Sequence, residues 1–334
     1  MNSPDVAHAT VSVIIPAYNA AQYINEALSS VVKQSYPKVE IIVINDGSPD
    51  TPILEEVITP FLERIVYVEQ ENRGPSAARN VGILRSRGEY VAFLDSDDFW
   101  LPEYLAFQME LFQQSPPPDL VYTDGLIIGE TPFSGQRVMN IRPSSGTATF
   151  ESLLVEKCQV PTSGTVARKR VLIEAGLFDE GFSRAEDYDL WLRVAYRGGR
   201  IAYQRRVLWR SRAHSGSLSS HIAAMNAGQA QVLIKLEKTL RLDPGVRSIL
   251  QDTITRAKAY SELEHGRRKI VERRFEEARG SFVKANTYFR SKKLRLALLG
   301  LKVAPNLTRW AARAWEKLLL VALRLRPKGP GWQD

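Results

Sequence analysis

The 334 residues of this chain suffice for one large domain with an appendage, or for two domains. Its 44% hydrophobic and 25% charged residues are typical of a globular protein. The single cysteine, Cys158, excludes an intramolecular disulfide framework and fits a reducing compartment. No stretch approaches the ~18 consecutive apolar residues of a membrane-spanning helix, and the N-terminal segment lacks the basic and apolar regions of a signal peptide. We therefore expect a cytoplasmic protein.

The net charge of +8 is unevenly distributed along the chain. Residues 1–220 hold 21 Lys and Arg against 27 Asp and Glu, a net charge of −6. Residues 221–334 hold 24 against 10, a net charge of +14. A strongly basic tail indicates an anionic surface as partner, although an Arg-rich solvated helix face has the same composition.

The first hundred residues alternate between short β-branched runs and helical patterns. Strands are predicted near residues 11–16, 40–44, 65–69 and 89–94, with helices near 20–34, 52–62 and 75–86 between them. This order predicts an α/β, Rossmann-like, mostly parallel sheet with helices on both faces. Ligands of such sheets bind outside the carboxyl ends of the strands.

The pattern is less regular beyond the three prolines at 116–118. We expect a strand at 119–124, a loop-rich segment at 125–147 and a helix at 184–196 whose Trp191 packs in the core. From about residue 223 the composition predicts a C-terminal α-helical extension, in which residues 257–285 have the spacing of a single tetratricopeptide-type helix pair. Residues 309–326 combine Trp310, Trp315 and leucines with basic residues, which is typical of a helix lying in a membrane interface. A helix docked on the protein's own core is the alternative.

The most informative segment is Leu94-Asp95-Ser96-Asp97-Asp98, directly after a predicted buried strand. Clustered carboxylates repel one another unless a cation lies among them, and a divalent ion bound to nucleotide phosphates meets that need. Helix capping by aspartate is the alternative, and for Asp98 we favour a cap of a helix entered through residues 99–102.

Five motifs in register resemble the family 2 inverting glycosyltransferases. They are residues 11–19 (VSVIIPAYN), 45–48 (NDGS), 74–80 (GPSAARN), 94–98 (LDSDD) and 185–187 (AED), and the match covers about residues 10–215. The resemblance implies the GT-A fold, a nucleotide-diphosphosugar donor and metal-assisted transfer with inversion. The sequence departs mildly from the usual family pattern at Asn45, where an aspartate is common.

The resemblance implies roles for individual residues. Asp97, with Asp95, would hold Mg²⁺ or Mn²⁺, and His214 lies where some relatives have a further ligand. Asp187 corresponds to the general base, with its neighbour Glu186 as the fallback. The residues implied in nucleotide binding are Pro16, Ala17, Tyr18, Asp46, Arg79, Asp95 and Ser96; Arg79 is also a candidate for holding the acidic strand ends together, and Asp46 for a turn.

The sequence thus predicts a catalytic domain at residues 1–220 and a basic helical extension at 221–334, with a membrane-surface helix near 305–326. The expected activity is transfer from a UDP- or dTDP-sugar to a hydroxyl of a glycan, lipid-linked or polysaccharide-precursor acceptor, peripherally at the inner membrane. A non-catalytic adaptor that binds nucleotide sugars is one alternative. A sugar nucleotidyltransferase is another, which the absence of a Gly-rich basic loop after the first strand disfavours. We expect no nucleic-acid partner, because no aromatic-interleaved recognition module is visible.

Overall fold

The computed structural model describes residues 9–214 and 222–307. It divides into two compact units, one comprising residues up to 128 together with 135–212, the other residues 129–134 together with the chain from 213 onward. Among the described residues, no helix has both the length and the apolar character needed to cross a membrane.

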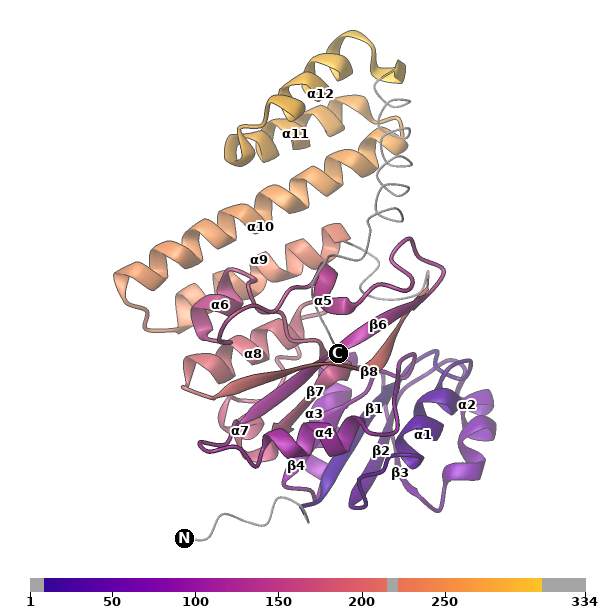
Figure 1. Ribbon diagram of the computed structural model, residues 1–334. Coiled ribbons are helices and arrows are strands. Elements are labelled where there is room, and N and C mark those ends of the chain that lie inside the picture. Colours follow the sequence, from indigo (N-terminus) through magenta and orange to yellow (C-terminus); the bar gives the residue numbers. More distant parts are fainter. Residues whose placement is uncertain (1–8, 215–221, 308–334) are drawn as a thin grey trace. The chain divides into compact units, whose positions relative to one another are not determined.

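The first unit is built on an eight-stranded mixed sheet of order β3-β2-β1-β4-β7-β6-β8-β5 (Figure 1). The expected parallel arrangement holds for β3, β2, β1 and β4, whereas the pairs β4–β7, β7–β6 and β8–β5 are antiparallel. The switch follows the loss of regular strand–helix alternation after residue 116. The strands are β1 (Val11–Ala17), β2 (Val39–Asp46), β3 (Ile65–Gln70), β4 (Tyr90–Phe93), β5 (Phe99–Trp100), β6 (Leu120–Gly129), β7 (Thr165–Arg168) and β8 (Ile201–Ala213).

Helices cover both faces of this sheet, as predicted. The helices are α1 (Ile24–Val32), α2 (Thr51–Ile58), α3 (Pro75–Arg85), α4 (Tyr104–Leu111), α5 (Val138–Ile141), α6 (Phe150–Leu154), α7 (Lys169–Glu174) and α8 (Glu186–Tyr196), with 3-10 turns η2 (Thr59–Phe61) and η3 (Thr162–Gly164). The segment 99–102, predicted as a helix entrance, instead contains the short strand β5, and α4 begins only at Tyr104.

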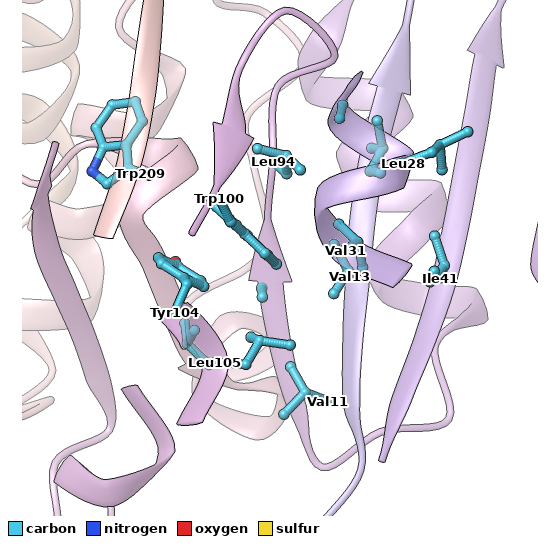
Figure 2. Close-up of a cluster of buried hydrophobic side chains, with 14 of the residues drawn as sticks. Val11, Val13, Leu28, Val31, Ile41, Leu94, Trp100, Tyr104, Leu105 and Trp209 are labelled. Atoms are coloured by element: carbon cyan, nitrogen blue, oxygen red, sulfur yellow. The ribbon is translucent and has the colours of Figure 1, made fainter. Parts of the chain in front are cut away.

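Alternate side chains of the strands enter two different cores. Val11, Val13 and Ile15 of β1 pack with α1, α2 and α4, where Trp100 and Tyr104 stack with ring centroids 4.0 Å apart (Figure 2). Ile14 faces the other way and lies against Gly82 of α3, where any Cβ would be 2.4 Å from its side chain. This period of two is what a sheet covered on both sides requires.

The helix α8 packs on the α3 side of the sheet through Trp191. This side chain is buried and makes tilted or edge contacts with Phe93 and Phe178, at centroid distances of 6.1 and 6.0 Å. The prediction that Trp191 is a core residue is therefore confirmed. Its packing fixes the first turn of α8, which follows Ala185, close to the end of β4.

Residues 222–303 of the second unit form the helices α9 (Ile222–Thr239), α10 (Pro244–Val271), α11 (Phe275–Phe289) and α12 (Lys292–Val303). The predicted helix pair at 257–285 corresponds to α10 and α11, which approach closely where Gly266 meets Phe282: a Cβ there would be 2.5 Å from the ring. Residues 309–326, predicted to form an interfacial helix, lie outside the described residues.

Candidate active site

The carboxyl ends of β1, β2 and β4 meet at one edge of the sheet, because the three strands are parallel neighbours. This edge carries Pro16, Ala17 and Tyr18, then Asp46, then the acidic run after β4. Tyr18 is 50% exposed, as a side chain available to stack on a ligand would be, whereas Ala17 is buried. The loop after β1 is linked to the loop after β2 by a hydrogen bond of 2.7 Å from the Asn19 amide to Ser48 Oγ.

Asp46 organises the loop before α3. Its Oδ1 accepts hydrogen bonds from Gln70 Nε2 and the Arg73 amide, at 2.7 and 2.9 Å, and its Oδ2 accepts one from the Gly74 amide at 2.8 Å. The adjoining Gly47 has φ +60°, and a Cβ on it would be 2.6 Å from the backbone nitrogen of Asn72. The Asp46 carboxylate thus holds residues 70–74 against the end of β2, and its role in nucleotide binding stays a prediction.

Arg79 of α3 joins the acidic strand end to α8. Its Nη2 donates to Asp95 Oδ1 at 2.8 Å, and its Nη1 donates to Glu186 Oε1 at 2.7 Å. Burial alone would lower the pKa of this guanidinium, but the charges of the two carboxylates outweigh it and raise the pKa. Arg79 is therefore a buried, permanently charged bridge, one of the two roles anticipated for it.

Asp98 is a buried carboxylate that accepts a hydrogen bond from the Arg212 amide at 2.8 Å. The expectation that it caps the following helix is wrong, because α4 begins six residues further on, at Tyr104, and its N-cap is Glu103. Burial raises the pKa of Asp98 well above its ordinary value, and the charges of Asp97 and Asp95 raise it further. A second contact also holds the acidic segment 95–98 in place, because Arg212 Nε donates to the Asp97 carbonyl at 3.0 Å.

The carboxylate cluster fits a hard divalent cation. Asp95, Asp97 and Asp98 lie within four residues at this strand end, and carboxylate oxygens are the ligands that Mg²⁺ and Mn²⁺ prefer. Asp95, Ser96 and Asp97 are half-buried rather than sealed. Over the described ranges, no group of three or more His, Cys, Asp or Glu side chains is arranged to hold a metal ion.

Glu186 and Asp187, adjacent in sequence, face different partners. Glu186 is buried against Arg79, and burial raises its pKa although Arg79 opposes the shift. Asp187 is half-buried, and its Oδ2 accepts a hydrogen bond of 2.8 Å from Thr162 Oγ1. The preceding Ala185 has φ +59°, a left-handed conformation that costs an L-residue about 1–2 kcal/mol. Consecutive residues of a helix point about 100° apart, and Asp187 is the more accessible of the two carboxylates.

The turn η3 contributes residues that the sequence analysis did not identify. Thr162 donates to Asp187, while Ser163 Oγ accepts from the Asp95 amide at 3.1 Å and its carbonyl accepts from Trp100 Nε1 at 2.7 Å. One turn therefore contacts both the acidic strand end and the start of α8. The only clue in the sequence is a short run of small polar residues after Pro161 in an otherwise apolar stretch.

His214 differs from the other predicted site residues in the unit to which it belongs. It is half-buried, directly follows β8, and belongs to the second unit, whereas the other predicted site residues belong to the first. Its role as a metal ligand stays a prediction.

Comparison with known proteins agrees with this fold. The sequence model of glycosyl transferase family 2 matches residues 12–175. The uncharacterized glycosyltransferase RC0461 of Rickettsia conorii is 31% identical over 227 residues, which are 66% of this chain and 37% of that protein. The chain thus spans little more than a third of that relative's length.

Two solved structures share the fold. TarS of S. aureus (residues 1–349, in complex with UDP-GlcNAc) has a TM-score of 0.64 at 18% identity, covering 92% of each chain. The mannosyltransferase PcManGT of Pyrobaculum calidifontis, in complex with GDP-Man and Mn²⁺, has a TM-score of 0.61 at 21% identity, covering 97% of this chain and 88% of that one.

The mixed sheet, with its acidic run at the end of β4 and a carboxylate pair at the start of α8, defines a protein of the GT-A fold. Within that class, the chain belongs to glycosyltransferase family 2 through the domain that contains residues 12–175.

Proposed function

We propose that this chain transfers a sugar from a nucleotide diphosphosugar to an acceptor hydroxyl, with inversion at the anomeric carbon and with Mg²⁺ or Mn²⁺ as cofactor. The observation that carries the proposal is the chain of contacts linking Asp95 through Arg79 to Glu186, which is followed by Asp187. It holds a candidate base at a defined position relative to the carboxylates that would face the donor diphosphate.

Inversion in one displacement needs a base on the side opposite the leaving group. Asp187 is the group we assign to this task, because Glu186 is already engaged with Arg79, whereas Asp187 is oriented by one hydroxyl and is half-buried. It would take the proton of the acceptor hydroxyl as the oxygen attacks the anomeric carbon. The Thr162 hydroxyl and the Tyr188 amide donate to Oδ2 and Oδ1 of Asp187, at 2.8 and 2.7 Å, and together fix the orientation of the carboxylate.

The donor diphosphate would lie beside Asp95 and Asp97, which would hold the divalent ion. That ion would supply electrostatic stabilisation of the leaving diphosphate. Tyr18, half-exposed directly after β1, would stack on the base, and Asp46 supports the segment 70–74 before α3. A UDP- or dTDP-sugar is our preferred donor, and a GDP-sugar is the competing choice because PcManGT is in complex with GDP-Man. The acceptor we propose is a glycan, lipid-linked or polysaccharide-precursor hydroxyl.

The first experiment measures thermal shifts with UDP, dTDP, GDP and their sugars, each with and without Mn²⁺, followed by release of nucleotide from the donor that binds. A ligand that binds only the folded protein raises the Tm by mass action. We expect a Mn²⁺-dependent shift with one base, lost in Asp97→Asn. Asp187→Asn should keep that shift but release nucleotide at least about 100-fold more slowly.

The matched control is Glu174→Gln, which removes a carboxylate from the exposed side of α7 and should leave both readouts unchanged. Full turnover in Asp187→Asn would refute the assignment of the base. Binding without any turnover in the wild type would favour the non-catalytic adaptor. No shift with any nucleotide would refute the proposed function as a whole.

A further inference from the structure

The last described helix, α12, has one face in the core of the second unit. Leu294, Ala297, Leu298 and Leu301 recur at intervals of three and four residues and pack against the cluster formed by Ile270, Ala278 and Phe282 of α10 and α11. Leu301 is almost fully buried there. This face accounts for the docking of α12 on its own unit.

The opposite face of α12 is also apolar. Leu296, Leu299 and Val303 are 71%, 57% and 74% exposed, respectively. At 100° per residue their positions fall within about 60° of one another, on the side of the helix away from Leu301. A helix that is apolar on both sides is expected to be covered on both. The outer face, defined as Leu296, Leu299 and Val303, therefore requires a second apolar environment.

The charges beside the outer face identify that environment. Most cations of residues 262–284, where α10 leads into α11, pair with acidic neighbours, as in Arg268–Glu272, Arg274–Glu277 and Lys284–Glu262.

On α12 the situation is different. Residues 291–307 contain four basic residues and no acidic one. Within the described parts of the chain, Lys292, Arg295 and Lys302 make no ion pair. Their positive charge is thus left for an external anion.

We propose that the outer face of α12 lies in the headgroup region of an anionic lipid bilayer, with its leucines and valine among the upper acyl carbons. An apolar stripe flanked by lysine and arginine suits such an interface, because the long side chains reach the phosphates while their stems stay in apolar surroundings. Nucleic acid would neutralise the cations but leave the apolar stripe in water. A second copy would cover the stripe but bring like charges together. The proposal is independent of the proposed catalytic function.

The test is flotation of the full chain with vesicles of phosphatidylcholine alone and with 30% phosphatidylglycerol. We expect binding to the anionic vesicles only, weakened at high salt because the charges are screened. Each cation near an anionic surface strengthens binding about fivefold. Lys292→Gln/Arg295→Gln/Lys302→Gln should therefore weaken binding by roughly 100-fold, and Leu296→Gln/Leu299→Gln should weaken it by at least about tenfold.

The matched control is Ile53→Gln/Leu84→Gln, which removes two equally exposed apolar side chains from α2 and α3 of the first unit. It should bind anionic vesicles like the wild type. Circular dichroism melting verifies that each variant is folded, and if Leu296→Gln/Leu299→Gln is not, single substitutions Leu296→Ser and Val303→Ser replace it. Unchanged vesicle binding of the folded outer-face variants would overturn the proposal. The proposal would also be overturned if the wild type formed a dimer that these substitutions dissociate. Binding of the wild type to RNA, without any binding to vesicles, would overturn it as well.

Discussion

Arg79 and Glu186, 107 residues apart in the chain, form a buried ion pair in which Nη1 donates to Oε1 at 2.7 Å. The same guanidinium holds Asp95 through Nη2 at 2.8 Å. A planar group with fixed donor directions can meet two carboxylates at once, which a lysine ammonium at the end of a flexible stem does less well. The relative position of the β4 end and the α8 start therefore depends on this one side chain.

Replacing Arg79 by Met should lower the free energy of unfolding by about 3 kcal/mol, since it leaves one buried and one half-buried carboxylate without their cation. Arg79→Lys should restore part of this loss. Urea unfolding measures both. The control is Arg87→Met, which breaks the ion pair with Glu40; because the Arg87 side chain is 81% exposed, we expect a loss below about 1 kcal/mol. Equal losses in the two Met variants would show that Arg79 is not a structural bridge.

Thr162→Val should lower kcat about tenfold with little change in donor KM, because the hydroxyl that orients Asp187 is lost while the fold of η3 is kept. Steady-state kinetics at varied donor concentration measure both constants. Thr162→Ser keeps the hydroxyl and should behave like the wild type. A kcat of Thr162→Val equal to that of Thr162→Ser would contradict the orienting role.

Asp98→Asn should raise the Tm of the metal-free protein at pH 7. The pKa of Asp98 is raised in the folded state, so its contribution to stability is greatest below the unfolded pKa of about 3.9 and is lost as the pH rises through the folded value. Asparagine carries no charge, so this loss of folding stability does not occur. Its side-chain oxygen can still accept the hydrogen bond from the Arg212 amide. Melting curves from pH 5 to 8 should converge at the acidic end. A lower Tm for Asp98→Asn at pH 7 would contradict the prediction.

Glu40→Gln should show the opposite pH dependence. Burial raises the pKa of Glu40, but hydrogen bonds from the Arg87 amide, the Ser12 hydroxyl and the Arg87 side chain outweigh it and lower the pKa. Its stabilisation is therefore present above about pH 4.3 and lost as the pH falls through the folded value. We expect a loss of about 1–2 kcal/mol at pH 7. Urea unfolding at pH 7, 5 and 4 should show the difference from the wild type shrinking with acidity; a constant difference would argue against an ionised Glu40.

The amino-acid sequence by itself was sufficient to predict the front half of the sheet. The alternation of short β-branched runs with helical patterns before residue 94 is a local property, and it predicts both the parallel pairing and the edge at which Tyr18, Asp46 and Asp95 meet. The change to antiparallel pairing at β7 was not predictable in this way, because strand pairing depends on contacts between distant segments. Short strands such as Phe99–Trp100 carry too little periodicity to be distinguished from the start of a helix.

The five motifs determined the family and the candidate residues, but only the tertiary structure decided how those residues are used. Asp98 is a buried acceptor for β8 instead of a helix cap, because its partner Arg212 lies 114 residues away. Thr162 and Ser163 join the site because packing of Trp100 brings η3 beside the end of β4. A sequence pattern reports the residue types that a chemistry needs, whereas directional hydrogen bonds across a folded core determine which carboxylate is engaged and which is accessible to substrate.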